Sequence, residues 1–178
     1  MAVSMISQNV WNQVYARLSA PSGGFNDGLA ANAVNYGLST FIQVSWTAPS
    51  NNFFPGQVDF QDLETSGILK YPAACLYILE SANANLEKFH QFSGPVRCVF
   101  EVGLSWTSIK GQVPFDSYAN CVEDVVIDVV NRMENQDWTN NVSYNGQIQC
   151  KRGPITFGAQ NYRQKVGFSM MFEVDTNP

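Results

Sequence analysis

The sequence predicts an α+β fold in which a mainly antiparallel sheet of about four to five strands packs on one long helix. Two observations predict it. Apolar residues alternate with other residues in segments 96–106 and 166–174, as they do in strands with one buried face. Between these segments, Ser117–Asn135 repeats its apolar residues at helical spacing. A length of 178 residues suits a single domain with a sizeable core.

Residues 1–24 are predicted to form an N-terminal helix and its end. Apolar residues recur four positions apart, at Ile6, Val10, Val14 and Leu18, which places them on one helical face. The sequence PSGG at Pro21–Gly24 ends this helix, because proline and glycine are poor helix formers. We expect this helix to pack near the long one.

Residues 25–70 are predicted to form a long variable loop region. Within it, the apolar spacing allows only a short helix over Leu29–Val34 and a strand over Phe41–Trp46. The pair Phe53-Phe54 lies in a polar stretch, so these rings either fold back onto the domain or dock onto a neighbouring subunit. The segment Pro49–Lys70 is long, and loops of this length in a compact domain are usually functional or mobile.

Residues 71–178 are predicted to form the sheet-and-helix core. A continuous apolar run after a proline predicts a buried strand over Ala74–Leu79. Clean alternation predicts a long strand over Gly94–Trp106 and a closing strand over Val166–Val174. Because Asp116 is a good helix N-cap, we expect the long helix to begin directly after it.

The segment Val142–Cys150 allows two interpretations. Its alternation runs unbroken, which favours a single strand with a bulge at Gly146. The dipeptide Asn145-Gly146 is also typical of a two-residue hairpin turn.

Composition and charge disfavour several classes of partner. The net charge is −5 and no run of Lys or Arg is present, so we expect no specific nucleic-acid binding. No segment has the length of a membrane span, and the N-terminus lacks the pattern of a signal peptide. The four cysteines are too scattered for a zinc site and are expected to be buried free thiols: Cys75, Cys98, Cys121 and Cys150.

No catalytic motif is present, so we expect no enzyme, no catalytic residue and no cofactor. The single histidine, His90, has no nucleophile or acid near it in the sequence. On the long helix, Asp124 and Asp128 share a face, and Glu123 lies beside them. Two carboxylates could start a metal site, but no further ligand is placed to complete it. We therefore expect these three to form an acidic face toward solvent, a lumen or another subunit.

The predicted sheet has a second face that is unusual for a solvent-exposed surface. On the closing strand, Ser169 and Met171 point away from the apolar face, with Gly167 next to them. On the other long strand, Arg97 and Val99 do the same. Because these side chains are small or apolar beside one charge, we expect them to contact a neighbouring subunit, together with the Phe53-Phe54 pair.

The order of predicted elements resembles that of the tail terminator proteins of long-tailed bacteriophages and of related tail-completion and neck subunits. The similar features are a strand led by a proline in YPAACL at Tyr71–Leu76, the helix Ser117–Asn135 between strand pairs, and the closing QKVGFSMMFEV. The resemblance covers the chain from Pro72 onward. The long segment 25–70 departs from the family pattern.

The resemblance implies a structural virion protein of the tail or neck, assembled in the host cytoplasm. It implies a homo-oligomeric ring, a hexamer in the family, that caps the tail tube and stops its polymerisation. One side of the ring would contact the tail-tube protein and the other the head-completion proteins, and DNA would pass through the lumen without specific binding. The alternatives are another neck or tail subunit of this fold, or a module that binds a small molecule or peptide.

Overall fold

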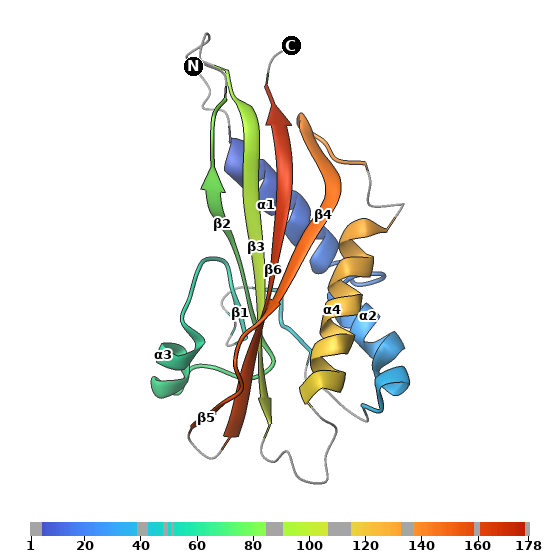
Figure 1. Cartoon of the computed structure of the whole chain (residues 1–178), viewed down its shortest axis with the longest axis vertical. Coiled ribbons are helices and arrows are strands. Elements are labelled where there is room, and N and C mark those ends of the chain that lie inside the picture. The colour runs from blue at the N-terminus through green and yellow to red at the C-terminus, as the bar shows by residue number, and fades with distance from the viewer. Residues whose placement is uncertain are drawn as a thin grey trace.

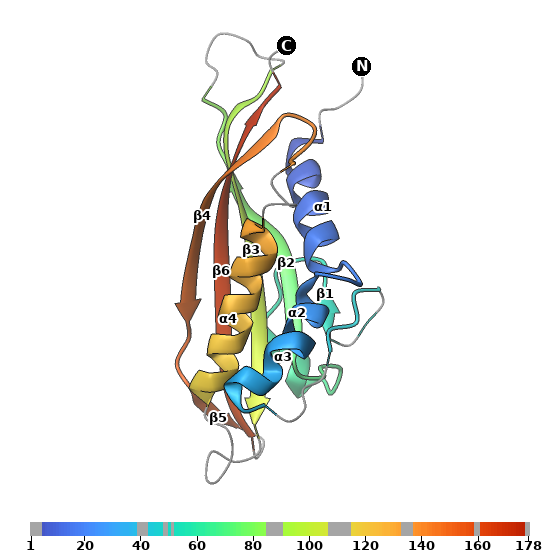
Figure 2. The same cartoon turned by 90° about the vertical axis from the view of Figure 1, so that its right-hand side faces the viewer.

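Six strands form one sheet, and the helices α1, α2 and α4 lie along one of its faces (Figures 1 and 2). The computed structural model describes residues 5–38, 43–47, 50, 52–84, 91–106, 115–132, 137–158 and 161–176. In chain order the elements are α1 (Ile6–Leu18), α2 (Phe25–Asn32), the 3₁₀ helix η1 (Ala33–Tyr36), β1 (Phe53–Phe54), α3 (Phe60–Thr65), β2 (Ala73–Ser81), β3 (Ser93–Trp106), α4 (Phe115–Asn131), β4 (Val142–Arg152), β5 (Thr156–Gly158) and β6 (Asn161–Asp175).

The predicted α+β class and mainly antiparallel sheet are confirmed. The strand order is β1-β2-β3-β6-β4, and β5 pairs with β6 beyond the end of β4. Only the β1–β2 pair is parallel among these strands. The sheet has more strands than the expected four to five because β1 and β5, of two and three residues, are too short to leave a periodic pattern in the sequence.

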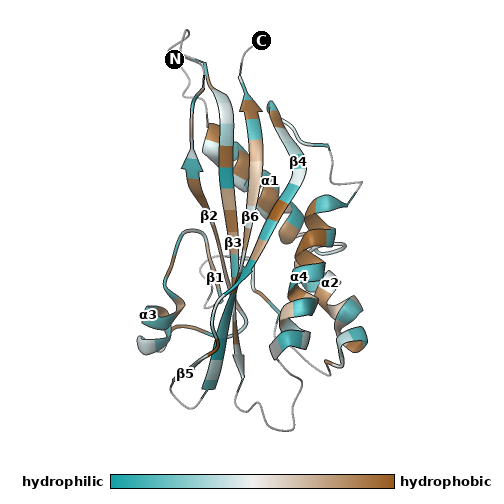
Figure 3. Cartoon of the chain, viewed as in Figure 1, coloured by the Kyte–Doolittle hydropathy of each residue, from teal (hydrophilic) through white to brown (hydrophobic). Residues whose placement is uncertain are grey.

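The long strands bury one face, as their alternation predicts. Phe168, Met170 and Phe172 of β6 are fully buried under the helices, and Phe100 of β3 is opposite Phe168 in the register. The two rings stack with centroids 6.2 Å apart. Figure 3 shows the resulting change between hydrophobic and hydrophilic residues along β3 and β6. This layer of side chains between sheet and helices is the main core.

The prediction of one long helix over the sheet is matched only in part. The helix α4 runs over Phe115–Asn131 instead of Ser117–Asn135, so Asp116 lies in its first turn and is not its cap. Its predicted final residues 133–135 lie outside the described part of the chain. The helices α1 and α2 pack beside α4 and share the covering of the sheet (Figure 2).

The prediction that residues 25–70 form a loop region is wrong for most of the described part. The segment contains α2, η1, β1 and α3. Phe25 and Leu29 of α2 are fully buried, and Phe25 packs edge-on against Phe100 with centroids 5.5 Å apart. Each element is only two to eight residues long, and tertiary packing stabilises elements too short to show a full period.

The expected strand over Phe41–Trp46 is absent in its described part, residues 43–46. Side-chain amides take the place of a neighbouring strand here. The amide of Asn26 bonds both the N–H and the C=O of Val44, at 3.0 and 2.8 Å. The buried amide of Asn52 accepts from the N–H of Ser45 and donates to the C=O of Gln43. These side chains thereby provide main-chain N–H and C=O groups with hydrogen-bond partners that a neighbouring strand would otherwise supply.

The segment from Val142 is one strand with a bulge, and the hairpin alternative is excluded. β4 pairs with β6 along its length, and the register shifts between Tyr144 and Ile148. Gly146, inside that shift, has φ +81°, a conformation that glycine adopts without strain. The bulge re-aligns the rest of β4 with β6, so Ile148 and Cys150 return to the helical side of the sheet.

Candidate functional site

The side chains of the described residues that could bind a metal or act as nucleophiles are considered first. No group of three or more His, Cys, Asp or Glu side chains there is placed to hold a metal ion. Burial raises the pKa of the Cys75 thiol to about 12 and that of Cys121 to about 11, so both are poor nucleophiles near neutral pH. The one histidine, His90, lies outside the described residues.

The face of the sheet opposite α1, α2 and α4 is the candidate site, and we call it the second face. It is formed by the odd-numbered residues of β3 and β6 with their partners on β2 and β4. In Figure 1 the helix α1 passes behind the strands, so the second face is turned toward the viewer. Side chains from elements far apart in the sequence meet here.

The four contact residues predicted on strands lie together on the second face. In the register of β3 and β6, Arg97 is opposite Met171 and Val99 is opposite Ser169. Val99 is only 7% exposed, and the other three are half-buried. Arg97 forms an ion pair with Glu80 of β2, with 3.1 Å between Nη2 and Oε1. The patch therefore combines small and apolar side chains with a charge that is already paired.

The prediction that Phe53 contacts a neighbouring subunit is wrong. Phe53 is 2% exposed and lies on the helical side, with its ring centroid 4.9 Å from Trp46 and 5.6 Å from Tyr15. Because successive residues of a strand point to opposite faces, Phe54 lies on the second face, where it packs half-buried near Phe60. Of the two alternatives for this pair, the structure shows folding back onto the domain.

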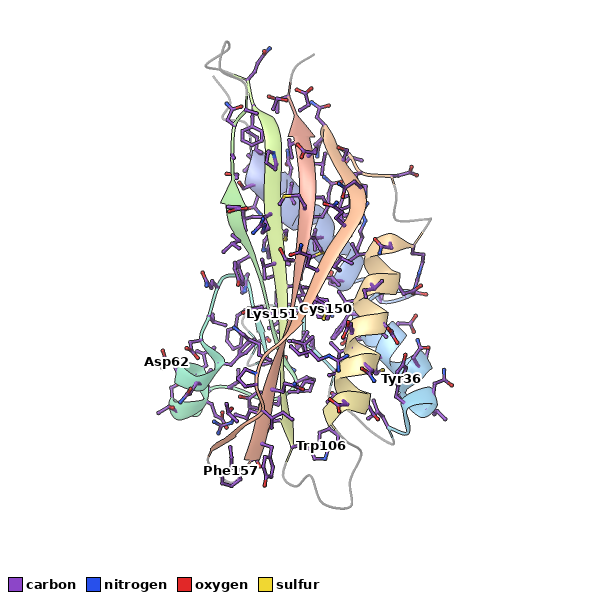
Figure 4. All side chains as sticks on the ribbon, viewed as in Figure 1. Tyr36, Asp62, Trp106, Cys150, Lys151 and Phe157 are labelled. Carbon is purple, nitrogen blue, oxygen red and sulfur yellow. The ribbon has the colours of Figure 1, made fainter. Side chains whose placement is uncertain are left out.

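The acidic residues of α4 each have a partner within the chain. Glu123, Asp124 and Asp128 lie on the outer sides of the helix, and the structure does not bring them into one site. Glu123 pairs with Arg152 of β4, with 3.0 Å between Oε2 and Nε. Asp124 accepts a hydrogen bond from Tyr36 of η1, and Asp128 forms an ion pair with Arg132. These contacts tie β4 and η1 to α4. Figure 4 shows Tyr36 beside α4.

One segment between β1 and β2 covers half of the second face. We call this segment, Gly56–Lys70 with α3 inside it, the strap. Its buried side chain is Phe60, 8% exposed, which lies over Gly103 of β3. A Cβ at Gly103 would be 2.9 Å from Cδ2 of that ring, so only glycine allows this approach. The strap thus covers the half around Gly103, and the half around Val99 and Met171 stays open.

Polar contacts also join the strap to the sheet. Glu64 of the strap forms an ion pair with Arg163 of β6 and accepts a hydrogen bond from Tyr71 Oη at 3.0 Å. Beside this pair, Glu101 is a buried residue, 9% exposed, and its carboxylate lies 3.0 Å from Lys165 Nζ. The residues of the two ion pairs are 99 and 64 positions apart, so the sequence offered no local signal for these pairs.

A cavity of about 560 Å³ lies between the strap and the strands. Asp59 and Phe60 of the strap line one side, and Glu101, Arg163 and Lys165 line the other. Its volume falls in the range that holds small molecules. The charges in its wall are largely compensated within the chain, because Arg163 pairs with Glu64 and Lys165 with Glu101.

An exposed apolar tip lies at the β5 end of the sheet and was not predicted. Ile155 is 47% exposed and Phe157 is 67% exposed. Phe157 packs on Tyr162 of β6 with centroids 4.9 Å apart, and Tyr162 is opposite Trp106 in the register. Figure 4 shows Trp106 and Phe157 at this same end. Alternation alone could not mark this tip, because it does not tell which apolar residues stay uncovered.

Comparisons with protein-family models and with curated proteins found no match for this chain. Among the helices that the structure describes, none combines the length and the apolar character that crossing a membrane requires. The arrangement of the second face therefore carries the argument about function.

Proposed function

We propose that the chain is a structural subunit of a bacteriophage tail or neck, resembling a tail terminator, and that it acts as a homo-oligomeric ring. The observation that carries the proposal is the open half of the second face. Val99, Ser169 and Met171 meet there on two long neighbouring strands, and no described helix of the chain covers them. Val99 is already buried within the chain, and a neighbouring copy would complete the burial of Ser169 and Met171 beside it.

The order of the observed elements supports the resemblance. A helix, α1, comes first, and β2 follows directly after Pro72. The long strand β3, the helix α4 and the strands β4 and β6 then succeed one another as in the family. The strap is an addition within the segment that departs from the family pattern.

Charge supports the proposed passage of DNA through the ring. The chain has a net charge of −5, so its surface as a whole repels a nucleic acid backbone. A lumen that does not bind DNA lets it slide. In this proposal one side of the ring stops the tail tube by contacting the tail-tube protein, and the other meets the head-completion proteins.

The proposal predicts that the purified chain forms closed rings, alone or with tail-tube protein. Size-exclusion chromatography with light scattering gives the mass, and negative-stain microscopy gives the shape. A hexamer of the 19.8 kDa chain is expected in one of the two samples. A monomer in both would contradict the proposal.

A matched pair of variants tests whether the open half makes the contact. Met171→Glu places a carboxylate on the half-buried patch and should convert the ring to monomers while the chain stays folded. Val34→Glu makes the same kind of change at a side chain of η1 that is 82% exposed, and should leave the ring intact. If the Met171→Glu variant forms rings as stable as those of the wild type, the contact between subunits lies elsewhere.

The cavity beneath the strap favours a second candidate function, the binding of a small molecule. Its wall offers the Phe60 ring beside the paired charges of Glu101 and Lys165, which suits a ligand with one apolar and one polar part. Two results together would favour this function over the first: the wild-type chain forms no ring, and a compound of this kind raises its melting temperature.

A further inference from the structure

The strap is attached to the rest of the chain by few side chains. In the cluster on the second face, the fully or largely buried members are Phe60, Ala73 and Cys75, and this cluster is separate from the main core. Nine of the strap's residues are exposed, among them Ile68 at 53%. Besides Phe60, the strap adds to this cluster only the half-buried side chains of Val58 and Leu69, so its apolar burial is small compared with that of the main core.

The main-chain hydrogen bonds of the strap are largely internal. Leu63 N–H donates to Asp59 C=O, Ser66 N–H to Asp62 C=O and Ile68 N–H to Leu63 C=O. The side chain of Asp59 caps α3 by accepting from the N–H of Gln61 at 2.8 Å. These bonds can persist when the strap moves as a body, so opening does not break them.

We propose that the strap opens as a unit, independently of the main core, and exposes the covered half of the second face. Opening requires that Phe60 leave its place over Gly103 and that Glu64 separate from Arg163. Both changes occur on one side of the sheet, and the helices on the other side keep their packing. In the open state Ala73, Cys75 and Gly103 are exposed next to the open half. The exposed area of the second face therefore depends on whether the strap is open or closed.

Two cysteines of the chain report on this opening. Cys75 lies beneath the strap and Cys98 lies in the main core, and both thiols are fully buried. Alkylation of each requires exposure of its sulfur. If the strap opens by itself, Cys75 is modified through that opening, whereas Cys98 is modified only when the whole domain unfolds.

The experiment is alkylation of the native full chain by iodoacetamide at pH 8, followed at each cysteine by peptide mass spectrometry. We expect Cys75 to react at least about tenfold faster than Cys98, after division by the rates in the denatured chain. Phe60→Ala removes the anchor and should accelerate Cys75 by about tenfold or more, and Cys98 by no larger factor, because unfolding of the whole domain breaks the same contact. Glu64→Gln removes the ion pair, keeps the shape, and should act in the same direction.

The matched control is Ile68→Ala, which removes an exposed apolar side chain from the same strap and should change neither rate. Equal rates for Cys75 and Cys98 in the wild type would overturn the proposal. So would a faster Cys75 that neither Phe60→Ala nor Glu64→Gln affects, because another motion would then expose it. The result does not depend on the proposed ring, since a monomeric chain can show it.

Discussion

At the scale of single residues, the two faces of β6 set different requirements. Phe172 is fully buried between the sheet and the helices, with its centroid 4.8 Å from Trp138 and 5.0 Å from Tyr144. Ser169, three residues earlier, lies half-buried on the second face. A core position and a position on the second face therefore lie on the same strand, so substitutions at the two can be compared without a change of secondary structure.

Phe172→Asp is expected to abolish soluble folding. An aspartate at this position would be buried without a partner, at a cost of several kcal/mol, in a domain whose whole stability is about 5–15 kcal/mol. Circular dichroism and solubility of the purified variant measure this. Ser169→Asp is the control, because its carboxylate can reach solvent, and it should fold. Wild-type behaviour of Phe172→Asp would mean that the assignment of the buried face is wrong.

At the scale of elements, the bulge in β4 depends on the backbone of one residue. Gly146 has φ +81°, and a Cβ there would have nothing nearer than Asn131 Oδ1 at 4.0 Å. Space is therefore not the constraint at this position. The left-handed conformation itself is what other residues adopt only with strain.

Gly146→Ala is expected to lower the free energy of unfolding by about 1 kcal/mol, because alanine disfavours a positive φ. Urea denaturation followed by tryptophan fluorescence gives the value. Gly56→Ala is the matched control, since Gly56 has no positive φ and an added Cβ there meets nothing within 4 Å. A loss of the same size in both variants would argue against a special role of the bulge.

At the scale of the whole molecule, buried thiols and phenols couple stability to alkaline pH. Burial raises the pKa of Cys75 from the ordinary 9.0 to about 12, and that of Tyr144 from 10.0 to about 12. The folded chain therefore keeps these protons over a range in which the unfolded chain loses them. The stabilisation is complete below about pH 9 and disappears as pH rises toward 12.

We accordingly expect the free energy of unfolding to be about 3 kcal/mol lower at pH 10.5 than at pH 8. Urea unfolding curves at the two pH values measure the difference. Cys75→Ala removes one of the buried thiols, so its stability should depend less on pH than that of the wild type. Equal midpoints at both pH values for the wild type would show that these groups lose their protons at their ordinary pH in the folded chain.

The sequence by itself determined the class of fold and the buried face of the long strands. Alternation in β3 and β6 and the helical period of α4 extend over many residues, so their burial follows from the pattern alone. It also placed Arg97, Val99, Ser169 and Met171 on one face, because the period of a strand is two residues.

Only the tertiary structure decided what covers each face. Phe53 lies in the core and Phe60 on the second face because β1 pairs with β2 and the strap folds back over Gly103, contacts between distant parts of the chain. The three acids of α4 acquired partners for the same reason. A sequence pattern records which residues avoid water along one element, whereas the covering of a face depends on which distant elements pack there.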